Sequence, residues 1–327
     1  MLRAWDLVHR LPWFLLQRSD VVHEHMRLAE ELSDPVERFW AVNNASIVAL
    51  EQADPARFGE LVPQVLPLAA ATGQRLLEWI GGFVVVNQHI IRCGWDDAEA
   101  LMERTHRFGV ECGQPDADAV YASHLFEIRR AQGREEELVD LLRAVVESAP
   151  DIEAFRPALG VCYAALGLPD GRDLFEEDLA GGFSRYRHNG LWLTSMMMNA
   201  EIASFLGHQE AAEVLYDTLS PWRDQIAWTG TTAGGSVAGA VGELATLLGR
   251  FGAADAHLTR ALAVHRAFAA PAWVANTLVS LARLATARRA PGDDDTADAA
   301  IAEAAVLARE LGSATIERKL DSVAVLR

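Results

Sequence analysis

The segment from Trp228 to Gly242 is the stretch whose spacing invites a phosphate-binding interpretation. Gly230 and Gly235 have the four-residue gap of a P-loop, but Ser236 follows where that loop needs a lysine. Without the lysine the phosphates lack their counter-charge, so no nucleotide loop is predicted. Backbone N–H groups that open a helix can still hold an anion, and the weak candidates are Gly230, Gly234, Gly235 and Ser236. The favoured interpretation is a small-residue face for close helix packing, formed by Gly235, Gly239 and Gly242.

Ten histidines and three cysteines raise the question of metal binding or nucleophilic catalysis. His23 and His25 are two positions apart, which puts their rings on different faces of a helix, whereas two helical ligands need a spacing of three or four. No cysteine stands at zinc-ligand spacing from a histidine, and no Gly-x-Ser-x-Gly elbow is present. The sequence therefore predicts no metal, no cofactor and no catalytic residue.

Aromatic, amide and guanidinium side chains on the first helix of each predicted helix pair are the remaining candidates, and their chemistry would be recognition. A tryptophan in a repeat is more often a packing residue, because aromatic rings dominate core burial. Arginine and asparagine are harder to place in a core, since burying either one without partners is unfavourable. The candidates for a ligand-facing surface are Trp79, Tyr121, His124, Arg129, Arg156, Tyr163, Arg185, Arg187, Trp192, Asn199, Trp273 and Asn276.

Four arginines of this set are the preferred ligand-facing groups: Arg129, Arg156, Arg185 and Arg187. On a chain with a formal net charge of −17, they could attract an acidic peptide or a phosphate locally. The competing interpretation assigns these arginines to structural ion pairs.

The elements that would position these side chains recur along the sequence. Five turn glycines follow apolar helical stretches at intervals of 34 to 42 residues, and they are Gly94, Gly133, Gly167, Gly207 and Gly249. Weaker copies of the turn occur at residues 52–56 and 287–292. Glycine at the end of a helix supplies the left-handed conformation that a C-cap needs. A helix pair cannot bury its apolar face alone, so the pattern predicts stacked pairs.

These observations predict an all-α fold, a right-handed superhelical solenoid of about seven antiparallel helix pairs. We expect a single domain over residues 1–327, with capping helices at 1–50, repeats at 51–315 and a C-terminal end at 316–327. The β-branched stretches at 83–86 and 90–91 lie inside a helical register, so we predict no strand there. The glycine-rich residues 227–242 are the clearest irregularity in the array.

Composition and charge exclude several classes of function. The chain has 29 Lys+Arg against 46 Asp+Glu, and this acidic balance argues against nucleic acid as a direct partner. No apolar run approaches the roughly 20 residues of a membrane span. Three widely spaced cysteines are typical of reduced thiols, which favours the cytoplasm. Lys319 is the only lysine, and we interpret this bias towards arginine as the mark of a GC-rich genome without functional meaning.

Several longer motifs carry a resemblance to a known group of proteins. They span residues 129–134, 182–193, 211–222, 229–242, 248–252 and 271–277. In order and spacing, over about residues 100–315, they resemble the tetratricopeptide-like helical repeats at the C-terminal end of bacterial signal-transduction ATPase regulators. Those regulators join an ATPase module to a nucleotide cyclase domain or a LuxR-type DNA-binding domain. The resemblance implies a sensor or scaffold arm that binds a partner segment or a small effector inside its superhelix.

The function predicted from residues and resemblance together is a non-enzymatic, cytoplasmic binding module of a bacterial signalling or transcription regulator. It would recognise a peptide, a protein segment or a small molecule, with no direct nucleic acid or membrane contact, and a homodimer is a further expected state. No ATPase, cyclase or DNA-binding module is recognisable, so we expect either a fragment of a larger regulator or a stand-alone relative. Two alternatives stay open: a homo-oligomerisation scaffold and, ranked last, an enzyme with a superhelical active site.

Overall fold

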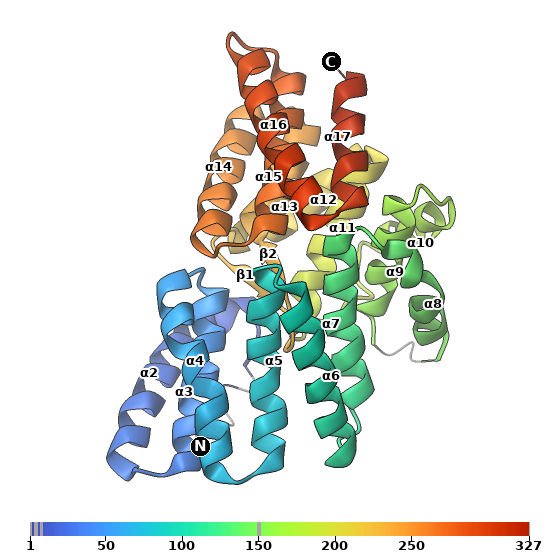
Figure 1. Ribbon diagram of the computed structural model, residues 1–327. Coiled ribbons are helices and arrows are strands. Elements are labelled where there is room, and N and C mark those ends of the chain that lie inside the picture. Colours follow the sequence, from blue (N-terminus) through green and yellow to red (C-terminus); the bar gives the residue numbers. More distant parts are fainter. Residues whose placement is uncertain (1, 3–5, 7–8, 149–151, 327) are drawn as a thin grey trace. The chain divides into compact units, whose positions relative to one another are not determined.

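A computed structural model describes the chain except for residues 1, 3–5, 7–8, 149–151 and 327 (Figure 1). The described residues form the α-helices α2 to α17, short 3₁₀ helices and two short strands. They group into two compact units. Unit 1 contains residues 1–127 and 225–233, and unit 2 contains residues 128–224 and 234–327. The helical fold class is confirmed, whereas the single repeat domain stays a prediction.

Unit 1 is built from helices joined by short turns. Its elements are η1 (Pro12–Phe14), α2 (Leu15–Leu32), α3 (Pro35–Glu51), α4 (Pro55–Thr72), α5 (Arg75–Ile91), α6 (Trp95–Glu111) and the first part of α7 (Ala117–Gln132). Helix α3 packs against α2, α4 and α5, and every residue from Ala41 to Leu50 is buried. A helix that is buried on all sides must be surrounded by other elements, which makes α3 the centre of this unit. The β-branched residues 83–86 lie in α5, as predicted.

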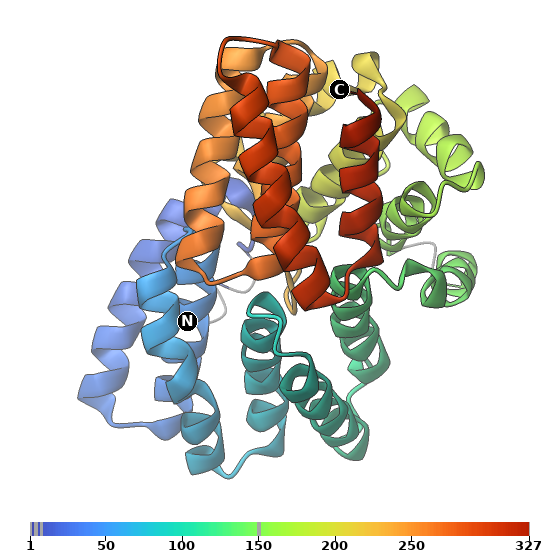
Figure 2. The ribbon, with the colours of Figure 1, turned by 45° about the horizontal axis from the view of Figure 1, so that its top comes forward.

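Unit 2 continues with helices in the order of the sequence. Its elements after α7 are η2 (Glu135–Glu137), α8 (Val139–Ser148), α9 (Phe155–Ala165), α10 (Asp170–Ala180), α11 (Trp192–Leu206), α12 (Gln209–Leu219), η3 (Ser220–Trp222), α13 (Val237–Leu247), α14 (Phe251–Ala267), α15 (Pro271–Arg288), α16 (Asp293–Leu311) and α17 (Ala314–Leu326). Helix α15 packs against α13, α14, α16 and α17. Figure 2 shows α14, α15 and α16 side by side in orange and red.

The turns predicted from the glycine spacing lie between helices of the structure. Gly167, Gly207 and Gly249 each follow a helix with φ of 67°, 64° and 69°, the left-handed conformation that was expected. Gly94 differs, because it is the N-cap of α6 with φ of −80°. Cys93 takes the left-handed conformation at that turn instead, with φ of 57°. This position therefore corrects the expectation that each turn glycine supplies the positive φ.

The glycine-rich segment corrects the expectation of a sheet-free chain. Strands β1 (Ile226–Trp228) and β2 (Ala233–Ser236) pair in a two-stranded sheet. Gly235 lies in β2 with φ of 85°, so it is not part of a helix face. Gly242 does lie in α13, where a Cβ would come within 2.6 Å of the Leu258 side chain. Close helix packing is thus confirmed for Gly242 and wrong for Gly235.

Residues 225–233 belong to unit 1, although the rest of that unit ends at residue 127. This segment, here called the strap, consists of β1 and the turn that follows it. The Gln225 amide donates to the Pro12 carbonyl at 2.9 Å, and the Ala233 N–H donates to the Asn87 Oδ1 at 2.9 Å. The hydroxyls of Ser123 and Thr231 lie 2.9 Å apart. Residues 226–228 are buried, and β1 contacts α3. The strap is therefore part of the core of unit 1.

Burial keeps one histidine of unit 2 neutral. It lowers the pKa of His265 to about 4. The His265 Nε2 accepts a hydrogen bond from the Ser236 N–H at 3.1 Å, and Nδ1 lies 2.9 Å from the Thr277 hydroxyl. Because Nε2 acts as an acceptor, protonation of this ring would break the contact with the backbone of β2.

Replacing His265 by Gln should flatten the pH dependence of stability. In the unfolded chain histidine titrates near 6.5, so between about pH 6.5 and 4 the unfolded state binds a proton that the folded state does not. Stability is therefore retained above this window and lost as the pH falls through it, by about 2 kcal/mol near pH 5. His265→Gln keeps an oxygen acceptor for the Ser236 N–H and should lose less stability than the wild type between about pH 7 and 5. Urea unfolding at both pH values measures this, and an identical loss would contradict a neutral buried ring.

A pair of glycines tests a close backbone approach in unit 2. A Cβ at Gly133 would lie 2.5 Å from the Ala314 nitrogen, whereas nothing lies within 4 Å of one at Gly167. Their φ values are alike, 74° and 67°. We expect Gly167→Ala to lower the free energy of unfolding by about 1 kcal/mol through backbone strain. Gly133→Ala should lower it by a further ~1–3 kcal/mol, because α17 must shift. Equal losses in urea unfolding would refute the close approach.

Candidate functional site

Helix α17 presents a polar face in unit 2. Thr315, Arg318, Lys319 and Ser322 recur at the spacing that aligns side chains on one side of a helix. They help to line a pocket of about 300 Å³, at the small end of the range for ligand sites. Its lining residues are Ala165 of α9, Ser204 and Phe205 of α11, Arg283 of α15, and Thr315, Arg318, Lys319 and Ser322 of α17.

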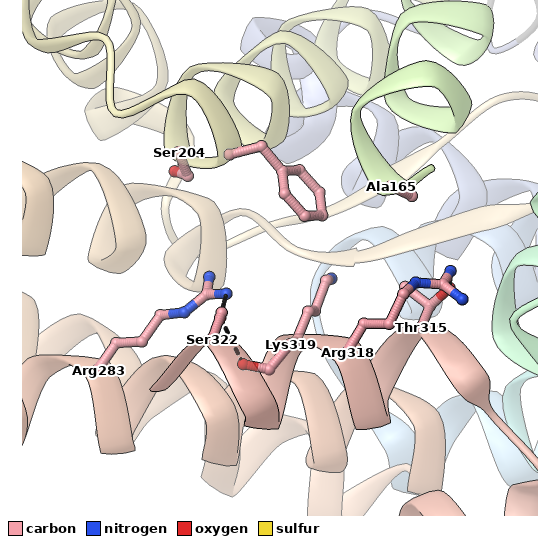
Figure 3. Close-up of a pocket in the computed structure, with 8 residues that line it drawn as sticks. Ala165, Ser204, Arg283, Thr315, Arg318, Lys319 and Ser322 are labelled. Atoms are coloured by element: carbon pink, nitrogen blue, oxygen red, sulfur yellow. Dashed lines mark hydrogen bonds between the residues drawn. The ribbon is translucent and has the colours of Figure 1, made fainter. Parts of the chain in front are cut away.

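The lining has an unusual charge balance for an acidic chain. Three cations, three hydroxyls and one aromatic ring face the pocket, and no lining residue is a carboxylate. Figure 3 shows Arg283, Lys319 and Arg318 extending from one side towards the space, with Ser204 and Ala165 on the opposite side. The Ser204 Oγ is buried and has no hydrogen-bond partner among the described residues. These groups offer hydrogen-bond donors to an anion.

Lys319 is held by a partly buried carboxylate behind the pocket. Its ammonium lies 2.8 Å from the Asn276 Oδ1, 3.3 Å from the Glu201 Oε1 and 5.3 Å from the centre of the Phe205 ring. The Arg130 guanidinium donates to the other Glu201 oxygen at 2.6 Å. Burial by itself raises the pKa of Glu201, but Arg130 and Lys319 outweigh it and hold the pKa at about 2. Glu201 is therefore ionised at neutral pH and fixes the lysine at the pocket wall.

The two arginines of the pocket have different partners. Arg318 donates to the Thr315 hydroxyl and lies 3.4 Å from the buried carboxylate of Glu135. Glu135 also accepts a hydrogen bond from the Thr315 hydroxyl at 2.7 Å, which ties η2 to the first turn of α17. Arg283 donates to the Ser322 Oγ at 2.9 Å, and no carboxylate of the described residues lies within ion-pair distance of it. Arg283 is thus the pocket cation whose charge is least compensated.

In unit 1, the residues predicted to face a ligand belong to packing contacts. Trp79 is buried against Ala117 and Val120. The Tyr121 hydroxyl donates to Glu103 at 2.9 Å. Burial lowers the pKa of His124 to about 4, despite backbone hydrogen bonds that raise it. These side chains therefore support the packing interpretation, and a role in binding stays a prediction.

The four preferred arginines all have carboxylate partners in unit 2. Arg156 donates to Asp178 at 2.9 Å, and Arg185 lies 3.1 Å from the same carboxylate. Arg129 pairs with Glu137 at 3.1 Å, and Arg187 pairs with Glu153 at 2.7 Å. A role of these four arginines in binding stays a prediction, whereas the contacts favour the structural ion-pair interpretation. The physical reason is that this acidic chain places a carboxylate within reach of each guanidinium.

The other predicted residues of unit 2 are distributed between packing and the pocket. Tyr163 is buried and accepts hydrogen bonds from Arg143, and the buried Trp192 ring meets His188 edge to face. Asn199 is buried with its amide donating to the Ser195 carbonyl, and Trp273 packs against His265 and Phe268. Asn276 is the predicted residue that holds Lys319 at the pocket.

The predicted anion loop uses several of its N–H groups internally. The N–H groups of Thr231 and Thr232 donate to the Thr229 hydroxyl, and the Ser236 N–H donates to His265. Gly230 and Gly235 have φ of 102° and 85°, and Gly234 lies beside Thr194. The Ser236 N–H is therefore not a free donor for an anion. Anion binding by Gly230, Gly234 and Gly235 stays a prediction.

The sequence analysis missed the pocket residues Ser204, Phe205, Arg283, Thr315, Arg318, Lys319 and Ser322. The available signal was the Thr-x-x-Arg-Lys-x-x-Ser spacing of residues 315–322 around the only lysine of the chain. We attributed that lysine to genome composition, and residues 316–327 to a C-terminal end. The structure instead places Lys319 in the pocket wall.

No protein-family model matches the chain, and no curated protein matches it. Within the part of the chain that the structure describes, no three His, Cys, Asp or Glu side chains lie close enough together to hold a metal ion. None of the described helices combines the length and apolar character needed to cross a membrane.

Replacing Glu201 by Gln tests the network behind the pocket. We expect Glu201→Gln to lower the free energy of unfolding near pH 7 by about 2 kcal/mol, because Arg130 and Lys319 lose their shared carboxylate. The loss is smaller than for a fully buried pair, since the Glu201 side chain is 23% exposed. The matched control is Glu303→Gln, which breaks an exposed pair with Arg266 and should change stability by less than about 0.5 kcal/mol. Similar losses in urea unfolding would argue against the buried network.

Proposed function

We propose that the chain is a helical binding module and that unit 2 takes a small anionic ligand in the pocket lined by α9, α11, α15 and α17. The observation that carries the proposal is the lining itself, with three cations and no carboxylate on a chain of formal net charge −17. Charge-assisted hydrogen bonds from guanidinium and ammonium groups are the strong contacts for an anion. Arg283, which has no carboxylate partner among the described residues, supplies guanidinium donors that the chain itself does not use fully.

The flanks of the pocket support a ligand with an apolar part. Phe205 and Ala165 line the pocket beside the cations. A pocket of about 300 Å³ is suited to a small molecule rather than a long peptide. Binding, not turnover, is the proposed activity, so the ligand would act as an effector.

The wider setting is also a proposal. The spacing of the turns and the order of the motifs support tetratricopeptide-like repeats in a right-handed superhelix, as in the bacterial signal-transduction regulators that the sequence resembles. In that setting an effector bound to unit 2 would regulate a partner protein in the cytoplasm. The choice of a small effector over a peptide comes from the size of the pocket.

Phenyl phosphate is a suitable probe for this pocket. We expect it to bind to the whole chain in calorimetric titration, and we expect Arg283→Gln to weaken binding at least about tenfold through the loss of a charge-assisted contact. Arg309→Gln is the matched control, because Arg309 is exposed on α16 and does not line the pocket. An absence of binding, or equal weakening by both variants, would refute the pocket as the site.

The only lysine gives an independent readout in the same experiment. Lys319 is the sole side-chain amine, so mass spectrometry can follow its acylation by an amine-reactive reagent without interference from other lysines. Bound phenyl phosphate should slow acylation of Lys319. Unchanged acylation at a saturating concentration would place the ligand elsewhere.

A further inference from the structure

We infer that the pocket selects a compact dianion, a phosphate monoester carried by a flat apolar group, over a singly charged anion of the same shape. This inference rests on the proposed anion site and adds the class of ligand.

The charge balance favours two negative charges on the ligand. Arg283, Arg318 and Lys319 line the pocket, and the carboxylates that contact them are Glu135 and Glu201. Glu201 is shared with Arg130, so these two carboxylates do not neutralise the three lining cations. A monoanion would leave part of this positive charge uncompensated in a partly enclosed site, where Coulomb interactions are stronger than in water.

The donor supply matches the acceptor oxygens of a phosphate. A guanidinium carries five N–H donors, and the Arg283 guanidinium makes one hydrogen bond within the chain, to Ser322. The Ser204 hydroxyl has no partner among the described residues. A phosphate monoester offers three strong acceptor oxygens and a charge of about −1.5 to −2 near neutral pH. A carboxylate, with two oxygens and one charge, would leave more of these donors unused.

The apolar residues that line the pocket favour a particular kind of chemical group attached to the phosphate. Lys319 lies over the Phe205 ring, so one face of that ring is already covered by the ammonium. Phe205 and Ala165 still line the pocket, and a flat ring on the ligand would bury apolar area against them. The small volume favours a free metabolite-sized molecule over a phosphorylated side chain within a protein.

Two probes of one shape separate charge from size. Phenyl phosphate and phenyl sulfate differ by one charge near pH 7, and the wild-type chain can be titrated with both. We expect phenyl phosphate to bind at least about tenfold more tightly, which corresponds to one further charge-assisted interaction. The preference should shrink near pH 5, because the second pKa of the phosphate is about 6 and no histidine lines the pocket.

Each outcome has a distinct meaning. Equal affinities near pH 7 would overturn the dianion inference and leave the anion pocket intact, whereas no binding of either probe would overturn the proposed function itself. Inorganic phosphate should bind more weakly than phenyl phosphate, and Phe205→Leu should reduce that difference; equal binding of the two in the wild type would overturn the aromatic carrier. Tighter binding of a phosphotyrosine amide with blocked ends would overturn the assignment to a free small molecule.

Discussion

The structure depends on packing neighbouring elements around helices that are buried on several sides. Helix α3 is buried from Ala41 to Leu50, and α15 has buried residues on every turn between Ala272 and Ala285. Neither helix can be stable in water with these surfaces exposed, so each needs neighbours on several sides. In unit 1, β1 of the strap at residues 225–233 packs against α3, although it is distant from α3 in the sequence.

Such packing also decides the state of its ionisable groups. Burial favours the neutral form of any side chain, and His124 and His265 follow that rule with pKa values of about 4. Glu201 departs from the rule, because Arg130 and Lys319 hold it ionised with a pKa of about 2. The difference lies in the partners, since two cations contact the carboxylate while the histidines meet hydroxyl and backbone groups. A fixed negative charge then positions Lys319 at the pocket.

The pocket is a place where pairing of charges stays incomplete. Arg156 has two carboxylate neighbours, and Arg288 likewise contacts Asp255 and Asp293. An acidic chain readily supplies such partners. No carboxylate lines the pocket, and in the part of the chain that the structure describes Arg283 contacts a hydroxyl and no carboxylate. The local surplus of positive charge on a chain of formal net charge −17 is the feature on which the proposed anion site rests.

Local patterns in the sequence are enough to predict the helices and their turns, because apolar spacing and C-cap glycines act over a few residues. Gly167, Gly207 and Gly249 lie at the turns for this reason. The strap, the sheet and the pocket form instead through packing between segments that are distant in the sequence. Lys319 and Glu201 are 118 residues apart, and Ser123 and Thr231 are 108 residues apart. No local pattern records such pairs, since their free energy arises only after distant helices have packed together.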